Sequence, residues 1–253
     1  MYPLRKATQL TTGDLDDDKA LAALYAYPEG QTGVARVRAN MIASIDGMAT
    51  VAGRSGVLGS SGDQRLFSVL RALADVIVVG ARTAVTEGYG PVRPHPLLGE
   101  LRTAEGRPAA AALALVSNTL TIPVPGEGDF TLAPSTIVLT CRSAPAGARA
   151  RLRDAGATVV DCGDEEVDPA QAIGYLADRG LTQILCEGGP ALLGSLLDRD
   201  LVDELCVTVS PRVTAGSGKH MTAGSDAVRG MRRAHVLADD EDYLYLRWVR
   251  DQE

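Results

Sequence analysis

Apolar residues follow two alternating patterns through the middle of the chain. Short continuous runs at 75–80, 112–116 and 183–186 are typical of strands that are buried on both faces of a sheet. Between the runs, apolar residues recur at helical spacing, most clearly at 62–73. From residue 34 to about 200, this alternation predicts a mostly parallel sheet with crossover helices. Further strands are predicted at 136–141 and 158–161, and further helices at 146–154, 169–179 and 191–198.

Local signals refine some of these elements. Ser61 and Gln64 have the spacing of a capping box at the start of the 62–73 helix. After residue 201, runs at 205–209, 235–237 and 243–249 alternate with no helical segment, which predicts antiparallel strands at one edge of the sheet.

The first 33 residues differ in texture from the rest. Several aspartates precede Ala20 and Leu21, as expected for a short helix with acidic residues in its first turn. We therefore predict an N-terminal helical extension over residues 1–33, packed on the core, followed by one domain over residues 34–253.

Composition limits the class of protein. A net charge of −7 argues against a broad nucleic-acid-binding face. An apolar run of roughly 20 residues, as a membrane span needs, is absent, and the N-terminus does not resemble a secretory signal. We therefore expect a cytoplasmic protein that binds neither nucleic acid nor membrane.

The sequence also lacks common metal and catalytic patterns. Its four cysteines are scattered singly, which predicts buried thiols rather than a zinc site or a disulfide framework. The motifs G-x-S-x-G, H-E-x-x-H and G-x-G-x-x-G are missing. Each of the three histidines is isolated, so we expect no metal and no histidine-based catalysis.

The segment Glu187-Gly188-Gly189-Pro190 is the most informative one in the chain. It joins a predicted strand to a predicted helix, and proline suits the first helical position. Glycines at this junction let a ligand approach the backbone, and a helix N-terminus attracts an anion such as a pyrophosphate. A tight turn with no ligand is the alternative.

Other polar residues lie at the ends of predicted strands, where open α/β sheets bind ligands. Asn40, Ser44 and Asp46 follow the first strand, although Asp46-Gly47 also suits a plain turn. Thr83 follows the strand at 75–80. Arg71, near the end of a helix, is either a ligand contact or an ordinary exposed arginine.

Three ordered segments together resemble a known family. They are 40–47, 70–83 and 186–189, the last followed by 201–205. Over residues 34 to 249 they resemble the reductase domain of bacterial riboflavin-biosynthesis deaminase/reductases. The resemblance implies a three-layer α/β/α fold of the dihydrofolate-reductase type, with a mostly parallel central sheet and antiparallel C-terminal strands. The zinc signature of the deaminase partner is absent, so we expect a stand-alone reductase.

The resemblance also implies an activity. The protein would be an NADPH-dependent pyrimidine reductase, often a homodimer, acting on 5-amino-6-(5-phosphoribosylamino)uracil. Hydride would reach the ring-opened sugar imine and give the ribitylamino product in riboflavin biosynthesis. Such a reaction depends on holding the nicotinamide and the imine carbon together, and it needs no covalent nucleophile.

Site residues carry over from the family by position. Ser55, Arg71 and Glu187 match substrate positions, and Arg71 would neutralise the substrate phosphate. Asp46 is a candidate for proton transfer, provided that burial raises its pKa. From its charge and position, Arg142 is expected to contact the cofactor's 2′-phosphate. The remaining cofactor positions are Thr83, Glu87, Ser117, Gly188, Gly189, Pro190 and Ala191.

Two departures from the family pattern leave the substrate open. Asn40 stands where the family often has lysine, and the substrate loop is altered over residues 87–93, where Arg93 is a candidate replacement for the family's phosphate-binding arginine. The alternatives are a reductase of dihydrofolate or another pteridine on the same fold, and a non-catalytic NADPH-binding protein.

Overall fold

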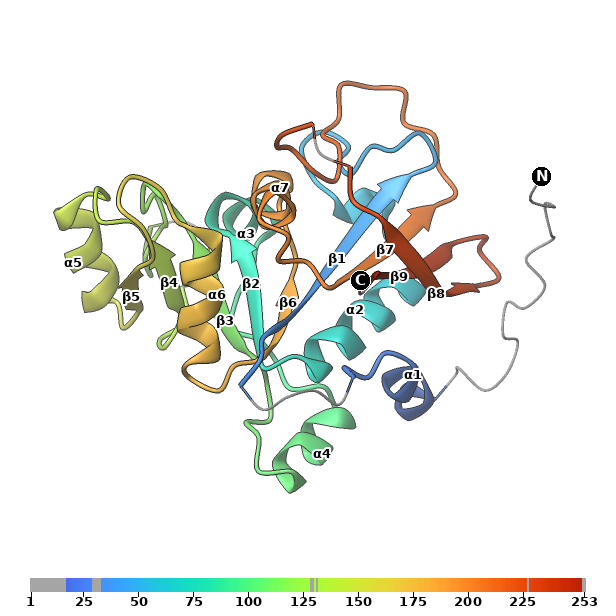
Figure 1. The fold of residues 1–253 in the computed structure, drawn as a ribbon, viewed down its shortest axis with the longest axis horizontal. Coiled ribbons are helices and arrows are strands. Elements are labelled where there is room, and N and C mark those ends of the chain that lie inside the picture. Colours follow the sequence, from blue (N-terminus) through green and yellow to red (C-terminus); the bar gives the residue numbers. More distant parts are fainter. Residues whose placement is uncertain (1–16, 29–32, 128–129, 131, 227, 252–253) are drawn as a thin grey trace.

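The computed structural model describes residues 17–28, 33–127, 130, 132–226 and 228–251. Within them, nine strands form one sheet in the order β5-β4-β3-β2-β6-β1-β7-β9-β8 (Figure 1). The strands are β1 Arg36–Ser44, β2 Val76–Gly80, β3 Ala112–Val116, β4 Ile137–Thr140, β5 Thr158–Asp161, β6 Gln183–Cys186, β7 Glu204–Ser210, β8 Met231–Ala238 and β9 Leu244–Arg250.

The direction of β7 corrects one prediction. Strands β1 to β7 are parallel, and only β8 and β9 run antiparallel to their neighbours. The segment predicted at 205–209 is therefore not antiparallel to the main sheet, because β7 pairs in parallel with β1, from Arg38 beside Glu204 to Ser44 beside Ser210. A crossover helix precedes β7 and returns the chain to the same direction. The predicted mostly parallel sheet is otherwise confirmed.

Helices cover both faces of the sheet and make three layers. They are α1 Asp18–Leu24, α2 Ser61–Leu73, α3 Ala81–Glu87, α4 Leu98–Ala104, α5 Ala146–Asp154, α6 Pro169–Ala177 and α7 Pro190–Asp198, with a short 3-10 helix η1 at Gly56–Leu58. The sequence pattern missed α3 and α4, which have seven residues each and no side-chain N-cap. Such short helices carry too few apolar repeats to be recognised from spacing alone.

Strand β2 shows how the two halves of the core are divided. Ile77 and Val79 point into a cluster with α2 and α5, whereas Val76 and Val78 point into a second cluster with α6 and α7. This alternation follows from the two-residue period of a strand. Because both faces are covered, the strand is apolar throughout, as its sequence indicated.

Helix α2 begins one residue earlier than predicted. Its N-cap is Ser60, whose hydroxyl accepts a hydrogen bond from the Asp63 backbone N–H at 3.1 Å. The predicted capping box of Ser61 and Gln64 is therefore wrong, because the extended backbone conformation needed at the cap falls on Ser60. The side chains of Asp63 and Gln64, in the first turn of this helix, line a cavity.

Helix α1 packs on the core, as predicted for the N-terminal segment. Tyr25 is fully buried, and the Tyr27 hydroxyl donates to the Ile184 carbonyl oxygen at 3.1 Å. Arg247 on β9 donates to the Leu24 carbonyl oxygen at 2.8 Å. In Figure 1, α1 lies beside α2. Residues 1–16 and 29–32 of the predicted extension lie outside the described residues, and the domain division remains a prediction.

A charged network lies beneath this segment. Arg38, which is 0% exposed, donates to Glu204 at 2.7 Å, and Arg247 donates to the same carboxylate at 2.8 Å. The Arg38 guanidinium also lies 4.0 Å from the centre of the Tyr27 ring. Because these charges are paired and buried, they hold the N-terminal segment against β1, β7 and β9.

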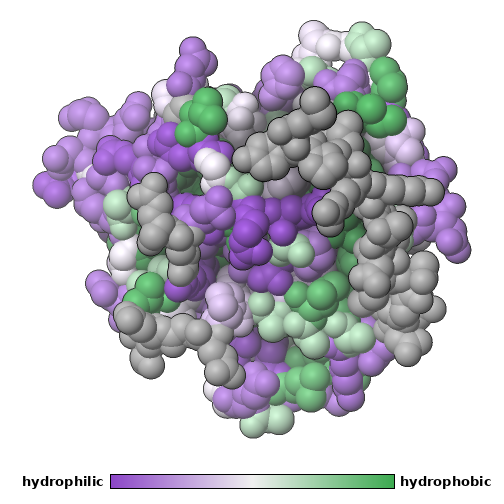
Figure 2. Space-filling model, turned by 45° about the vertical axis from the view of Figure 1, so that its right-hand side comes forward, coloured by the Kyte–Doolittle hydropathy of each residue, from purple (hydrophilic) through white to green (hydrophobic). Residues whose placement is uncertain are grey.

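The surface and the cysteines agree with the composition. All four thiols are free and buried, which confirms the prediction of apolar cysteines. On the face shown in Figure 2, the described side chains are mostly hydrophilic, and apolar ones form small separate groups. Among the helices described, none combines the length and apolar character that crossing a bilayer requires.

Candidate active site at the carboxyl ends of the strands

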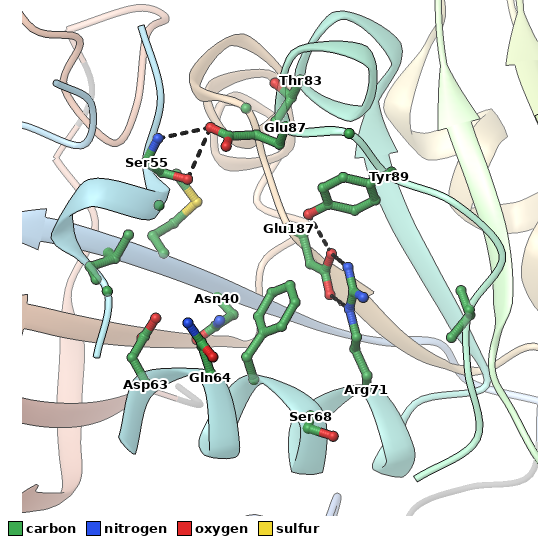
Figure 3. A pocket seen from close by; sticks show the side chains of 18 of the residues that line it. Asn40, Ser55, Asp63, Gln64, Ser68, Arg71, Thr83, Glu87, Tyr89 and Glu187 are labelled. Carbon is green, nitrogen blue, oxygen red and sulfur yellow. Dashed lines mark hydrogen bonds and ion pairs between the residues drawn. The ribbon is translucent and has the colours of Figure 1, made fainter. Parts of the chain in front are cut away.

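A cavity of about 790 Å³ opens where β1, β2 and β6 end. Helix α2 forms its floor, α3 and the loop at 88–95 form one wall, and the Glu187 turn lies at its back (Figure 3). The lining includes eight of the residues predicted for the site: Ser55, Arg71, Thr83, Glu87, Arg93, Glu187, Gly189 and Pro190. Residues far apart in sequence thus meet at one edge of the sheet, as expected for parallel strands.

Glu187 is held by two side chains. Arg71 donates from Nε and Nη2 to the two carboxylate oxygens, each at 2.7 Å, and the Tyr89 hydroxyl donates to Oε2 at 2.6 Å. The Glu187 side chain is only 1% exposed. The Arg71 guanidinium also stacks 4.1 Å from the centre of the Phe67 ring. Glu187 is therefore a fixed buried carboxylate, and two of the Arg71 nitrogens already have a partner.

Burial and charge set the protonation of this group. Burial acts to lower the pKa of Arg71, but its hydrogen bonds and charge attraction to Glu187 outweigh that effect and raise the pKa. Burial, together with the Glu187 charge, raises the pKa of Tyr89 well above its usual value. Arg71 therefore stays a cation, and Tyr89 stays a hydroxyl that donates to the carboxylate.

Ser55 and Glu87 form a second pair. Glu87 Oε1 accepts hydrogen bonds from the Ser55 backbone N–H at 2.8 Å and from the Ser55 hydroxyl at 3.0 Å. The pair links the segment before η1 to the end of α3 across the mouth of the cavity. The resemblance implied that Glu87 contacts the ribose of the cofactor. A ribose hydroxyl would then bind the same carboxylate that Ser55 already binds.

The glycine turn brings the starts of α3 and α7 together. The Gly80 N–H donates to the Gly188 carbonyl oxygen at 2.7 Å, and Gly189 is the N-cap of α7. A Cβ on Gly189 would lie 2.4 Å from Thr83 Oγ1, so only glycine fits there without a shift. The predicted strand-to-helix turn is confirmed, with Pro190 at the first helical position. Gly188 and Ala191 directly precede and follow Gly189-Pro190 in the chain.

The opposite end of the cavity is polar as well. Asp63 and Gln64 reach it from the first turns of α2, and Asn40 reaches it from β1 (Figure 3). The Asn40 Oδ1 atom is buried without a hydrogen-bond partner among the described residues. Sequence reasoning missed Asp63, because an aspartate in the first turn of a helix is usually explained by the helix dipole.

Asp46, the candidate for proton transfer, lies outside the cavity lining. It is exposed, and its carboxylate accepts hydrogen bonds from the Ser44 hydroxyl and from the backbone N–H groups of Thr214 and Ala215. These hydrogen bonds, with the one from Ser44 largest, lower its pKa. The burial and raised pKa on which its proposed proton transfer depended are absent, and its carboxylate holds the loop at Thr214 and Ala215.

Four predicted cofactor residues lie outside the cavity lining: Ser117, Arg142, Gly188 and Ala191. The Ser117 hydroxyl accepts from the Leu120 N–H at 2.9 Å, and exposed Arg142 pairs with Asp164 at 3.0 Å. Arg93, by contrast, lines the cavity and is exposed. His95 is locally bonded, as expected, because its Nδ1 accepts from two backbone N–H groups. In the described part of the chain, no cluster of three or more potential ligands could hold a metal ion.

Fold and site together define a three-layer α/β/α protein of the dihydrofolate-reductase type, with a ligand cavity at the carboxyl ends of its parallel strands. Residues 35–245 match the RibD C-terminal domain, and the chain belongs to that family. The predicted family is thereby confirmed.

Known proteins of similar sequence and structure agree with this assignment. The 2,5-diamino-6-ribosylamino-4(3H)-pyrimidinone 5′-phosphate reductase of Methanothermobacter thermautotrophicus is 28% identical over 79% of this chain and 93% of its own length. The Aquifex aeolicus enzyme of the same name is 26% identical over 75% and 82%. A pyrimidine reductase-like protein from Corynebacterium diphtheriae superposes with a TM-score of 0.79 and 25% identity, covering 92% of this chain and 99% of its own.

Proposed function

We propose that this protein reduces a 6-ribosylaminopyrimidine 5′-phosphate in riboflavin biosynthesis, with NADPH as the hydride source. One observation carries the proposal: a buried carboxylate, Glu187, is fixed in the ligand cavity beside a glycine turn that begins a helix. Membership of a family of reductases and relatives named as pyrimidine reductases support it. The family implies a nicotinamide cofactor, and the choice of NADPH is part of the proposal.

The residues around the turn fit such a cofactor. Gly80 and Gly189 present backbone without side chains, and α7 begins there with no side chain capping its N–H groups. Free N–H groups at a helix start favour a pyrophosphate. Thr83, Gly189 and Pro190 would hold the cofactor, which supplies a hydride when bound. We keep Ser117 and Arg142 as weaker cofactor candidates, because an extended dinucleotide can reach beyond the cavity.

The side chains of the cavity then orient the substrate. Glu187 can accept hydrogen bonds from sugar hydroxyls, since a carboxylate has more lone pairs than Arg71 and Tyr89 occupy. Exposed cations at the rim, Arg93 and Lys219, are suited to the phosphate. Arg71 can add to this charge only through atoms not already bound to Glu187.

Turnover tests the proposal directly. Adding a 6-ribosylaminopyrimidine 5′-phosphate to the protein and NADPH should cause the cofactor absorbance to fall, and product analysis should show the ribitylamino compound. Glu187→Gln should slow this reaction by about 100-fold, because a substrate-orienting charge is lost. The matched control is Glu241→Gln, an exposed carboxylate outside the cavity lining, which should change nothing. Absence of turnover by the intact protein would refute the function.

Assembly and location are proposed from the family resemblance. We propose a cytoplasmic homodimer, and light scattering on the purified protein tests the dimer by its mass. A monomer at micromolar concentration would contradict that part of the proposal without affecting the reaction.

A further inference from the structure

We propose that Asp63 selects substrates with a 2-amino-4-oxopyrimidine edge over pyrimidine-2,4-diones. The inference rests on the proposed function and deepens it, because it assigns the group that recognises the ring. Both ring types are candidates: the relatives named above act on a diaminopyrimidinone, whereas the resemblance implied a uracil.

The position of Asp63 leaves its carboxylate open to a ligand. The residue lines the cavity beside Asn40 and Gln64, at the end opposite Arg71 and Glu187 (Figure 3). A Cβ on Gly59 would lie 3.2 Å from Asp63 Oδ2, so the glycine leaves space next to that oxygen. The structural role of Asp63 in α2 uses only its backbone N–H, which Ser60 caps.

Asp63 also lacks a compensating charge. Among the described residues, no cationic side chain forms an ion pair with it, in contrast to Glu187, which Arg71 neutralises. Burial raises the pKa of Asp63, and the hydroxyl of Thr208 offsets this only in part. A partly buried carboxylate without a cation is costly, and a ligand that donates two N–H groups removes much of that cost.

Ring chemistry then decides which ligand fits. A 2-amino-4-oxopyrimidine presents the ring N3–H and the 2-amino N–H side by side, and a carboxylate accepts both in two parallel hydrogen bonds. In a 2,4-dione, a carbonyl oxygen replaces the amino group and faces the second carboxylate oxygen with lone pairs. The other place where two N–H donors could lie side by side is the edge formed by N1 and the nitrogen on position 6. That nitrogen carries the sugar and has no N–H in the imine form, so this edge cannot supply two donors. The dione therefore offers Asp63 one donor and one repulsion.

The neighbours of Asp63 suit the rest of the ring. Asn40 Oδ1 is buried and unpartnered in the described part of the chain, so its amide can bond another polar atom of the ligand. Phe67 lies one helical turn after Asp63, on the same face of α2, and lines the cavity. An aromatic face at this position can pack on a planar pyrimidine.

A binding experiment tests the inference independently of turnover. The probes are 2-aminopyrimidin-4(3H)-one and uracil, which carry an amino and an oxo group at ring position 2 and no amino group at position 6, and calorimetry measures each in the presence of NADP⁺. We expect the wild type to bind the first probe at least about 10-fold more tightly. In Asp63→Asn, whose amide offers one donor and one acceptor, this preference should disappear or reverse. Asp63→Ser is a second variant, and unchanged NADP⁺ affinity shows that each variant is folded.

A kinetic experiment tests the same point with substrates. The kcat/KM ratio of the diaminopyrimidinone phosphoribosyl substrate to the dione should fall by about 100-fold in Asp63→Asn. It should stay unchanged in Asp154→Asn, an exposed carboxylate on α5. A dihydropterin carries the same 2-amino-4-oxo edge, so its binding should also depend on Asp63. Comparing the kcat/KM of the dihydropterin with that of the ribosylaminopyrimidine then shows which of the two compounds supplies this edge.

The outcomes distinguish the two levels of proposal. Equal binding of the two probes by the wild type, or a preference that survives both Asp63 variants, overturns the role of Asp63. Reduction of the dione in preference to the diamino substrate also overturns it, while the reductase function stands. Selective Asp63-dependent binding without turnover of either phosphoribosyl substrate supports the role of Asp63 and refutes the proposed function.

Discussion

Replacing Arg71 by methionine should destabilise the protein more than replacing Glu187 by glutamine. The Glu187 side chain is 1% exposed, and Arg71 supplies two of its three hydrogen bonds, each at 2.7 Å. Removing one partner of a buried pair leaves a charge without compensation, which typically costs about 3–5 kcal/mol. The Arg71 side chain is 27% exposed, so water can enter from the cavity, and we expect a cost near the lower limit, about 3 kcal/mol.

Glu187→Gln has a smaller expected effect. The amide keeps the shape of the side chain, and the Arg71 that it leaves is exposed enough to be solvated. We expect a loss of about 1.5 kcal/mol, as for the loss of charge-assisted hydrogen bonds. The double variant contains neither buried charge. It should therefore be more stable than Arg71→Met alone, by about 1 kcal/mol, and the two changes should not add.

Urea denaturation of the four proteins measures these free energies of unfolding. Arg142→Met is the matched control, because Arg142 and Asp164 form an exposed ion pair with side chains 70% and 74% exposed. Its stability should equal that of the wild type within error. The reasoning is refuted if Arg71→Met lies within about 0.5 kcal/mol of the wild type, or if the double variant shows the sum of the two single effects.

Three further predictions concern the turn, acid stability and the Asp46 loop. Gly189→Ala places a Cβ 2.4 Å from Thr83 Oγ1 and should lower the free energy of unfolding by about 1–3 kcal/mol. Adding Thr83→Ala to the same chain should restore part of this loss. An unchanged midpoint of thermal unfolding in Gly189→Ala would contradict the prediction. Burial, with help from Arg247 and Arg38, lowers the pKa of His235 to about 4, so the unfolded chain takes up this proton first as pH falls below 6.5. The wild type should therefore lose about 3 kcal/mol between pH 6.5 and 4 that His235→Gln does not lose. Parallel stability profiles from chemical denaturation would argue against this. Because the pKa of Asp46 is lowered in the folded protein, the carboxylate adds to the free energy of unfolding above its unfolded pKa, and this addition is lost as pH falls below it. Asp46→Asn should therefore be less stable than the wild type at pH 7, and the difference in stability should close in acid. A difference that widens in the same titration would contradict this.

Local sequence patterns predicted the elements whose signals are local. The strand at Thr158–Asp161, the strand at Gln183–Cys186 and the helix at Ala146–Asp154 have the predicted bounds, because β-branched runs and helical repeats are complete within each segment. The direction of β7 has no local signal. It depends on the crossover through α7 and on pairing with β1, which lies more than 150 residues earlier in the chain.

Several of the residues predicted for the site line one cavity, but the contacts among them were not predicted. Family resemblance brought Arg71 and Glu187 to the same cavity, yet not to each other, since they are 116 residues apart and either could have faced the ligand alone. The role predicted for Asp46 depended on its burial, which only the three-dimensional surroundings decide. The Asp63 carboxylate lines the cavity from the first turn of α2, and no sequence motif marked that position.

Helix α2 connects the two proposed halves of substrate recognition. Asp63, Phe67 and Arg71 recur at intervals of four residues, so they lie along one face of the helix and line the same cavity. Eight residues at a rise of 1.5 Å each place the Cα atoms of Asp63 and Arg71 about 12 Å apart along the helix axis. That span accommodates a pyrimidine ring at Asp63 and a sugar at Glu187, with the glycine turn beside the sugar. In the proposed arrangement, the ring and the reacting carbon are recognised by different turns of one helix. Substitution of Asp63 should therefore change substrate preference without altering the Arg71–Glu187 pair.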